Sequence, residues 1–547
     1  MTPPPPTITR FSDIPELLGA LRRLPPERPG LTFYKGRARQ GSLSYGDLLV
    51  AVDRMTRRLR EEFGIQRGDR IAILAANRLE VPPLLLATMR IGAAVVPLNP
   101  TTGPADWDYV LAHSEARAIF GAKEMLARVG RLPPVVVAFE DEPVPAAEST
   151  AGAAAAISDE PAAPSSSLSR TMAVVLYTSG TTGNPKGVSL AQESLLANAW
   201  SMAVNFRLDG QTQFAVLPLY HAHALGFGLM TALTTGGHLV FTDRFDPFAW
   251  AEIVRAEKVL VTSVVPTLLT PLLQVGVRRD KVPTLRAILV SSAPLTADAA
   301  RTFESKTEIP LIQGWGLSEY TNFACCLSPD LPDADRRRLL YGGELTSIGG
   351  PLSGVEVKVA GPAGDALPED QRGELCIRGP STMLQYFKDA EATGAMLGGD
   401  GWLRTGDEGY FRLDGGVPNF FITGRIKEII IRDGDKFSPL AIERELLARV
   451  PDIEGRFVVL GFPHQTHGEE IGVYLEAEVV DDGLRARLET AVAALPLEMR
   501  PKVLLHGAAP IPRTHTGKIQ RRKLHPTFAA YRDCRGALKI ERAPDSP

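Results

Sequence analysis

Short apolar runs separated by helix-length segments dominate the first two thirds of the chain. The sequence reads as a strand at 71–76, a segment with apolar residues at helical spacing through Met89, and a second strand at 93–98. Similar β-branched runs recur further along, at 173–177, 238–241, 259–265 and 287–291. This alternation predicts layers of helices around a largely parallel β-sheet, the α/β class.

The pattern changes twice in the last third of the chain. After Ser347, short strands alternate with Gly and Asp turns, which predicts a compact β subdomain at about 347–424. After Arg425, strands and two helices alternate to the end of the chain, which is typical of a small α+β domain. We therefore expect a large N-terminal domain at 1–424, built of layered α/β subdomains plus the β subdomain, and a small C-terminal domain at 425–547.

Composition is that of a globular protein. The 547 residues are 44% hydrophobic and 22% charged, with a formal net charge of −3, so neither nucleic acid nor an anionic membrane is an expected partner. The segment 144–169 is rich in Ala, Ser and Pro and is expected to be a mobile surface excursion. The first residues lack a signal pattern, and Arg90 interrupts the longest apolar stretch, so we expect a soluble protein without a membrane span.

Cysteine and histidine usage argues against disulfides and structural metal. The four cysteines have neither CxxC spacing nor a disulfide framework, which favours a reduced, cytoplasmic setting. The pairs His221/His223 and His464/His467 have no third or fourth ligand at a plausible spacing, so no structural zinc site is expected.

The segment Tyr177 to Gly187, YTSGTTGNPKG, follows an apolar strand and is dense in hydroxyls, glycines and one lysine. Exposed N–H groups and a cation suit a loop around a polyphosphate. It is not the common P-loop, because Pro185 replaces the second Gly and Gly187 replaces the Ser/Thr that would hold Mg²⁺.

Four further segments follow this loop in order. They are LPLYHAHALG (217–226), QGWGLSE (313–319), GWLRTGD (401–407) with ITGRIKE (422–428), and PRTHTGK (512–518). Together the five segments closely resemble the adenylate-forming superfamily of acyl-CoA synthetases, adenylation domains and beetle luciferases. Each segment is weak evidence alone, whereas five in sequence are highly specific.

The resemblance implies an ATP and Mg²⁺ site. In the family the glycine-rich loop holds the β- and γ-phosphates, which maps to Thr178, Ser179, Gly180, Thr181, Thr182, Gly183 and Lys186. Glu319 is expected to hold Mg²⁺ together with Thr178, and Ser318 to contact the α-phosphate. Trp315 is the candidate for stacking on adenine. Asp407 and Arg425 are the candidates for binding ribose. Further nucleotide contacts are expected at Ser292, Ala293, Pro294, Gly314, Gly316 and Ile422.

The resemblance also implies two alternating half-reactions. Lys518 would bridge the carboxylate and the α-phosphate, and its loss is expected to cost about 3–4 kcal/mol of transition-state stabilisation. The small C-terminal domain would then rotate about a hinge at Lys427 to admit coenzyme A (CoA). Gly434 is expected to lie beside the pantetheine arm, and His221 to be the aromatic gate for the thiol.

The expected substrate is a hydrophobic carboxylic acid. No acid occurs from 217 to 228, where amino-acid-activating relatives place an Asp, so an α-amino acid is not expected. Small residues in this stretch, Ala222, Ala224, Gly226 and Gly228, are interpreted as leaving space for an apolar acyl group. The expected pocket residues are His221, Ala222, Gly226, Val265, Ser291, Gly316, Leu317 and Asn322. Departures from the family pattern are Gln192, Ser291, Gln385 and Gly424, and Ser291 is expected to narrow or polarise the pocket wall.

The function that we predict is an AMP-forming acyl-CoA synthetase, acting as a monomer or homodimer. One alternative keeps the adenylation but loads the phosphopantetheine arm of a carrier protein. Another is a non-catalytic nucleotide binder with the same fold, for which loss of Lys518 or Glu319 would be expected, and both residues are present.

Overall fold

The structure is a computed structural model that describes residues 8–141, 168–178, 184–513 and 519–544. The predicted excursion at 144–169 lies outside the described residues except for its last two positions. The chain divides into two compact units: Met1–Val357 with Ile377–Leu403 and Asp414–Asn419, and Lys358–Cys376 with Arg404–Leu413 and Phe420–Pro547. The second unit therefore takes in parts of the predicted β subdomain, and the boundary at 424/425 stays a prediction.

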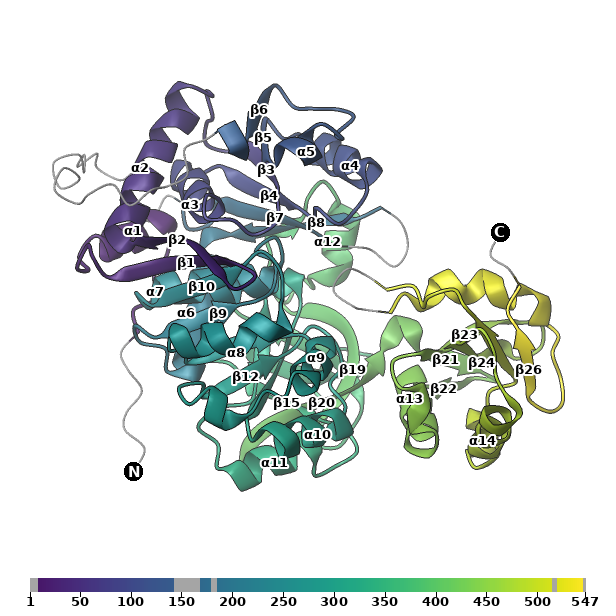
Figure 1. Ribbon diagram of the computed structural model, residues 1–547. Coiled ribbons are helices and arrows are strands. Elements are labelled where there is room, and N and C mark those ends of the chain that lie inside the picture. Colours follow the sequence, from purple (N-terminus) through teal and green to yellow (C-terminus); the bar gives the residue numbers. More distant parts are fainter. Residues whose placement is uncertain (1–7, 142–167, 179–183, 514–518, 545–547) are drawn as a thin grey trace. The chain divides into compact units, whose positions relative to one another are not determined.

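One sheet of the first unit is parallel at its centre, as predicted (Figure 1). Its strands lie in the order β18 (Gln385–Tyr386), β8 (Lys186–Ala191), β7 (Met172–Thr178), β4 (Ala94–Leu98), β3 (Arg70–Leu74), β5 (Ala118–Gly121) and β6 (Val135–Ala138). Only the pairs β7/β8 and β8/β18 are antiparallel among these.

Helices cover both faces of this sheet because its strands are apolar at consecutive positions. Ile71 and Ile73 belong to one buried cluster with α3 (Val81–Ile91). The alternating residues Ala72 and Leu74 belong to another buried cluster, with Trp107 of α4 (Pro104–Ser114). Successive side chains of a strand point to opposite faces, so continuous burial requires cover on both.

A second sheet of the first unit is also largely parallel. Its strands lie in the order β15 (Ser347–Pro351), β14 (Phe323–Cys326), β13 (Leu311–Gly316), β12 (Ala287–Val290), β11 (Val261–Val264), β9 (Thr212–Ala215), β10 (His238–Thr242), β1 (Pro29–Lys35) and β2 (Ala38–Ser44). The hairpin β1/β2 and the pairs β13/β14 and β14/β15 are antiparallel.

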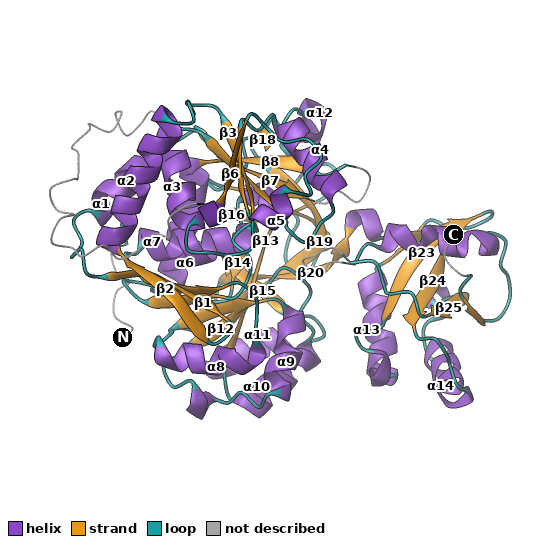
Figure 2. Ribbon diagram, turned by 45° about the horizontal axis from the view of Figure 1, so that its top comes forward, coloured by secondary structure: helices purple, strands orange, loops and turns teal. Residues whose placement is uncertain are grey.

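The largest core of the first unit contains residues of both sheets and of the helices packed with them. Figure 2 shows these helices and strands. The helices of this unit are α1 (Ile14–Leu21), α2 (Tyr45–Glu61), α3, α4 (Pro104–Ser114), α5 (Lys123–Leu126), α6 (Gln192–Phe206), the π-helix η4 (Ala224–Met230), α7 (Thr231–Thr234), α8 (Pro247–Ala256), α9 (Leu269–Gln274), α10 (Ala297–Thr307), α11 (Asp333–Tyr341) and α12 (Ala390–Met396).

The second unit has its own sheet and core. Four strands pass through the division between the units: β16 (Glu356–Ala360), β17 (Gly373–Arg378), β19 (Leu403–Asp414) and β20 (Val417–Arg425). The C-terminal sheet runs β22 (Asp435–Phe437), β21 (Ile430–Arg432), β24 (Gly468–Glu476), β25 (Val503–Gly507), β26 (Lys539–Arg542), with β23 (Phe457–His464) also paired to β24. Helices α13 (Pro439–Arg449) and α14 (Asp482–Ala493) contribute to one of its apolar cores.

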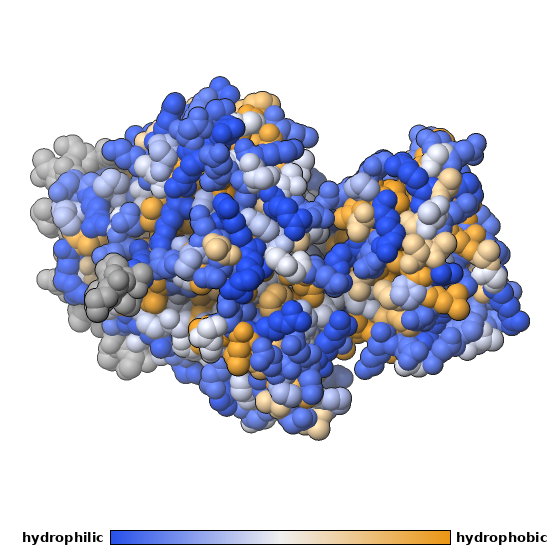
Figure 3. All heavy atoms as spheres, turned by 90° about the horizontal axis from the view of Figure 1, so that it is seen from below, coloured by the Kyte–Doolittle hydropathy of each residue, from blue (hydrophilic) through white to orange (hydrophobic). Residues whose placement is uncertain are grey.

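The surface is mixed in polarity. The face drawn in Figure 3 is mainly hydrophilic, with small scattered hydrophobic areas. Among the described residues, no helix combines the length and the apolar character that crossing a bilayer requires.

Candidate active site

The predicted phosphate loop joins two antiparallel strands. In the β7/β8 hairpin, Thr178 lies opposite Lys186, and Thr178 Oγ1 donates to the Lys186 carbonyl oxygen at 3.5 Å. The central positions of the loop, 179–183, lie outside the described residues. A P-loop leads from a strand into a helix, whereas this segment returns along its own sheet, so the two differ in structure as well as in sequence.

Helix α4 holds both ends of this hairpin turn. Tyr109 Oη donates to the Pro185 carbonyl oxygen at 3.3 Å, and His113 Nδ1 lies 2.7 Å from Tyr177 Oη. The Tyr109 and His113 rings stack with centroids 5.5 Å apart. Burial lowers the pKa of His113, so the ring stays neutral near pH 7. No sequence motif marks these α4 side chains, and we did not predict them.

Tyr386 connects the predicted magnesium acid with the predicted phosphate lysine. Its Oη donates to Glu319 Oε1 at 2.8 Å, and Lys186 Nζ lies 5.1 Å from the centre of its ring. Lys186 Nζ is also 3.6 Å from Asp389 Oδ2. Burial, and then the Glu319 charge, raise the pKa of the Tyr386 phenol, so it remains a neutral donor. The structure thus brings Glu319 and Lys186 to one aromatic side chain that the sequence did not single out.

A strained turn follows Glu319. Thr321 has φ +63° and ψ −52°, and the Asn322 amide donates to the Tyr320 carbonyl oxygen at 2.6 Å, which makes a γ-turn. Such a φ is unusual for a β-branched residue and stores strain. Thr321 Oγ1 donates to the Ser381 carbonyl oxygen at 2.8 Å, which helps to hold the turn.

The glycines before this turn allow close backbone approach. A Cβ on Gly316 would lie 1.7 Å from the Asn322 carbonyl oxygen, and one on Gly314 would lie 2.7 Å from the Phe323 ring. The hairpin β13/β14 therefore requires both glycines whatever else they contact. Trp315, between them, is 8% exposed, and Ser318 begins the 3₁₀ turn that carries Glu319.

A polar cluster lies at the start of the π-helix η4. His223 Nδ1 lies 3.1 Å from Ser291 Oγ and 3.2 Å from Ser292 Oγ. Ser292 has φ +71°, a second strained backbone position. His223 is 5% exposed, and burial lowers its pKa to about 3. In the sequence His223 stands out only as one of a histidine pair, and no pattern there predicts its contact with the expected pocket residue Ser291.

Two small residues of this region do not leave the space that we expected. A Cβ on Gly226 would lie 3.1 Å from Asn322 Nδ2, and one on Gly228 would lie 3.1 Å from Ala215 Cβ. The interpretation of these glycines as open space is therefore wrong, because neighbouring side chains already occupy it. They allow η4 to pack closely instead.

The remaining predicted residues of the first unit are placed as follows. His221 precedes η4, and its ring lies 4.5 Å from that of Tyr220 between centroids. The other positions are partly buried or exposed and lie near strand or turn ends: Ala222, Val265, Ala293, Pro294 and Leu317.

Two departures from the family pattern have structural explanations. Gln192 is fully buried, accepts from the Ile14 amide at 2.8 Å and donates to the Met89 carbonyl oxygen at 2.6 Å. It therefore ties α1 to the end of α3. Gly424 lets Ser438 approach, since a Cβ there would lie 3.0 Å from Ser438 Oγ. Gln385 is exposed in β18.

The predicted ribose residues meet within the second unit. Arg425 Nε lies 3.1 Å from Asp407 Oδ1, and the Asp407 side chain is only 10% exposed. The Asp407 amide donates to Thr405 Oγ1 at 3.1 Å, which orders the turn before it. Ile422 is partly buried in β20, the strand that ends at Arg425.

The predicted hinge lies beside a buried ion-pair cluster. Lys427 is exposed in a 3₁₀ turn. Next to it, Glu428 Oε2 lies 2.6 Å from Arg521, which also binds Glu443 at 2.8 Å. Arg521 is 7% exposed. It comes three positions after Lys518, which lies outside the described residues.

Gly434 is required by its backbone conformation. With Asp433 it forms the two-residue turn of the β21/β22 hairpin, at φ +55° and +88°. A Cβ on Gly434 would meet no atom within 4 Å. Within the chain, the left-handed φ rather than a close approach is therefore the reason for glycine here.

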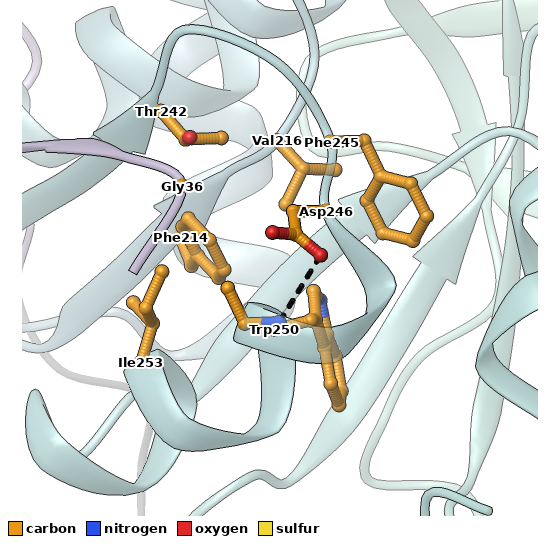
Figure 4. A pocket seen from close by; sticks show the side chains of 9 residues that line it. Gly36, Phe214, Val216, Thr242, Phe245, Asp246, Trp250 and Ile253 are labelled. Atoms are coloured by element: carbon orange, nitrogen blue, oxygen red, sulfur yellow. Dashed lines mark hydrogen bonds between the residues drawn. The ribbon is translucent and has the colours of Figure 1, made fainter. Parts of the chain in front are cut away.

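A small pocket lies apart from all of these residues (Figure 4). It has essentially no room for a bound water molecule. Its lining residues are Gly36, Phe214, Val216, Thr242, Phe245, Asp246, Ala249, Trp250 and Ile253. None of the predicted site residues lines it.

The chain is similar to known proteins over most of its length. The model of the AMP-binding enzyme family matches residues 21–387. A sulfoacetate–CoA ligase of Cupriavidus necator is 34% identical over 84% of this chain and 88% of its own length, and a feruloyl-CoA synthase of Amycolatopsis sp is 31% identical over 89% and 94%. The crystal structure of ATP-bound MatB from Rhodopseudomonas palustris is 26% identical, covers 95% of this chain and 100% of that chain, and superposes with a TM-score of 0.79.

These findings confirm the predicted α/β fold and the predicted enzyme class. ATP and CoA are its substrates together with a small-molecule acid. The chain belongs to the AMP-binding enzyme family and is an AMP-forming acyl-CoA synthetase, an acid–thiol ligase.

Proposed function

We propose that Lys186 and Thr178 bind the β- and γ-phosphates of ATP and that Glu319 holds the accompanying Mg²⁺. The observation that carries this proposal is the single Tyr386 side chain, which bonds the Glu319 carboxylate and offers its ring to Lys186. The Lys186 ammonium group, for phosphate oxygens, and the Glu319 carboxylate, for a metal, both contact the Tyr386 side chain. The glycine-rich positions 179–183 would complete the phosphate loop.

The residues fit a substrate-borne Mg²⁺. No cluster of three or more His, Cys, Asp or Glu side chains suited to a metal occurs among the described residues. Mg²⁺ at a nucleotide site needs only one or two carboxylates plus phosphates and water, which one Glu319 carboxylate supplies. Once bound, the ion would neutralise charge on the phosphate oxygens as pyrophosphate leaves.

The other roles follow the same assignment. Trp315 would stack on adenine, Asp407 and Arg425 would bind the ribose hydroxyls, and Ser318 would contact the α-phosphate. Lys518 would bridge the acid and the α-phosphate during adenylation. The ion pair between Arg425 and Asp407 supports the ribose assignment, because it aims the carboxylate and limits its rotation.

The acid is proposed to have an apolar body and no α-ammonium group. The stretch before and within η4 contains no Asp or Glu, so an ammonium group would have no carboxylate partner there. This absence supports the proposed substrate class. No carrier protein is proposed as a second acceptor, and the active form is proposed to be a monomer or homodimer. The buried free cysteines, Cys325, Cys326, Cys376 and Cys534, suit a reducing cytoplasm.

A panel of carboxylic acids with ATP and Mg²⁺ tests the proposal. We expect acid-dependent pyrophosphate release, and thioester only when free CoA is added. Lys518→Ala should abolish acid-dependent ATP–pyrophosphate exchange and spare CoA transfer from a preformed acyl-adenylate. Equal damage to both steps would contradict the role of Lys518, and thioester on a carrier protein alone would replace CoA as acceptor.

A further inference from the structure

A buried histidine at the start of η4 has one ring nitrogen without a partner. His223 Nε2 has no hydrogen-bond partner among the described residues, and the residue is only 5% exposed to solvent. A buried polar atom left unpaired costs about 1–3 kcal/mol. Because His223 lies beside residues of the predicted substrate pocket, a polar atom of a bound substrate could satisfy this nitrogen.

The neighbours of His223 are residues that we assign to the acyl pocket. Ser291 Oγ contacts its Nδ1, Asn322 Nδ2 donates to its carbonyl oxygen at 3.4 Å, and the ring packs edge-on against Phe323 at 5.1 Å. Gly226 follows on the same π-helix, where an added Cβ would lie 3.1 Å from Asn322 Nδ2. Irregular helices of this kind are frequent at functional sites.

Two serine hydroxyls lie within hydrogen-bond distance of the imidazole Nδ1. Ser291 and Ser292 each carry one O–H, and the printed contacts of both lead to His223 Nδ1 or to one another. Where Nδ1 accepts from one of these hydroxyls, the proton of the neutral ring is carried by Nε2. The ring stays neutral at physiological pH because burial lowers its pKa to about 3.

We propose that His223 Nε2–H is a specificity-determining donor that recognises an oxygen acceptor in the acyl group of the acid. The inference rests on the proposed function, and it narrows the substrate class to acids whose apolar body carries an ether, hydroxyl, carbonyl or sulfonyl oxygen. Ser291 and Ser292 act as positioning residues that hold the tautomer. An acid without such an oxygen would leave Nε2–H unpaired and bind its transition state less well.

Isosteric pairs of acids test the proposal. Phenoxyacetate with 3-phenylpropanoate, methoxyacetate with butanoate, and 4-methoxybenzoate with 4-ethylbenzoate each differ by one oxygen in place of CH₂. For the pair that fits the pocket, we expect the wild-type kcat/KM of pyrophosphate release to favour the oxygen acid by about 5- to 100-fold. His223→Phe should bring this ratio near one, and His223→Gln, which keeps a donor at the same reach, should retain most of it.

The controls separate this inference from a structural role. His238→Gln alters a different histidine, half-buried, whose Nε2 is already bonded to Thr32 Oγ1 at 2.8 Å, and should leave the ratio unchanged. A wild-type ratio near one for every pair, or a ratio that survives in folded His223→Phe, would overturn the inference while acid activation stands. Absence of acid-dependent pyrophosphate release from every pair would instead overturn the proposed function. Thermal melting of each variant, with and without ATP, verifies folding.

Discussion

At the residue scale, the most informative side chain is one that no motif marked. Tyr386 follows Gln385, a position noted only because it departs from the family pattern. Its hydroxyl donates to Glu319, a contact across 67 positions of sequence. A charged acceptor makes this bond stronger than a neutral one, and the bond limits the rotamers of the carboxylate that we assign to Mg²⁺.

Tyr386→Phe should lower kcat for pyrophosphate release by about 10- to 100-fold, because a hydrogen bond to a charged group contributes about 1.5–3 kcal/mol. The Mg²⁺ concentration for half-maximal rate should rise, while KM for the acid stays constant. Steady-state kinetics at several Mg²⁺ concentrations measure both. Tyr341→Phe is the matched control, since Tyr341 Oη donates to Glu304 Oε2 at 2.9 Å elsewhere in the same unit. Unchanged Mg²⁺ dependence in Tyr386→Phe would contradict the proposed positioning.

At the element scale, the phosphate hairpin depends on a helix that precedes it by some 70 residues. The β7/β8 register places Thr178 opposite Lys186, and α4 fixes the carbonyl group of Pro185 and the hydroxyl group of Tyr177. Strand pairing thus sets the ends of the loop, and α4 limits how far they move.

Tyr109→Phe should raise KM for ATP by about 2- to 10-fold and leave kcat nearly unchanged, because one neutral hydrogen bond contributes about 0.5–1.5 kcal/mol. Initial rates at varied ATP measure the split. Tyr474→Phe removes a similar bond, to the Ala509 carbonyl oxygen at 2.8 Å in the second unit, and should not change KM for ATP. A fall in kcat with constant KM would argue against a ground-state role for α4.

At the scale of the whole molecule, buried neutral histidines make the first unit sensitive to acid. Burial lowers the pKa of His113, His223 and His238 below the usual 6.5. As pH falls below about 6.5, the unfolded chain binds more protons at these groups than the folded chain does. The contribution of these histidines to the free energy of unfolding is therefore fully present above pH 6.5. It is lost as the pH falls towards the pKa of the folded state, which is about 3 for His223.

Lowering the pH from 6.5 to 5 should cost the folded first unit roughly 2 kcal/mol through His223 alone. In calorimetry, the melting temperature of the wild type should decrease over this interval more than that of His223→Gln. Parallel decreases in the two proteins would show that His223 titrates freely when folded.

The predicted hinge is tested with a rigid backbone. Lys427→Pro fixes φ near −65°, so it should retain ATP–pyrophosphate exchange and lose thioester formation. Lys427→Ala is the control, and it should retain both steps. Lys436→Pro would be a poorer control, because Lys436 pairs with Ile431 in a hairpin. Normal CoA transfer by Lys427→Pro would exclude a hinge at this residue.

Sequence by itself determined the α/β class, the enzyme class and the motif residues expected at the ribose. Asp407 and Arg425 belong to two different motifs that both predict a ribose contact, and they lie 3.1 Å apart. Apolar runs specify strands because burial on both faces demands them, and motifs specify site residues because backbone and side chain lie in one loop.

Only the tertiary structure decided which residues support those motifs. Tyr386, Tyr109, His223 and Arg521 act through contacts between distant segments, and no local pattern encodes such contacts. The glycines show the same limit: the composition of η4 suggested open space, but packing against Asn322 and Ala215 fills it. Close packing is a property of the neighbours that folding brings together, so only their coordinates reveal whether a small residue marks a pocket or a contact.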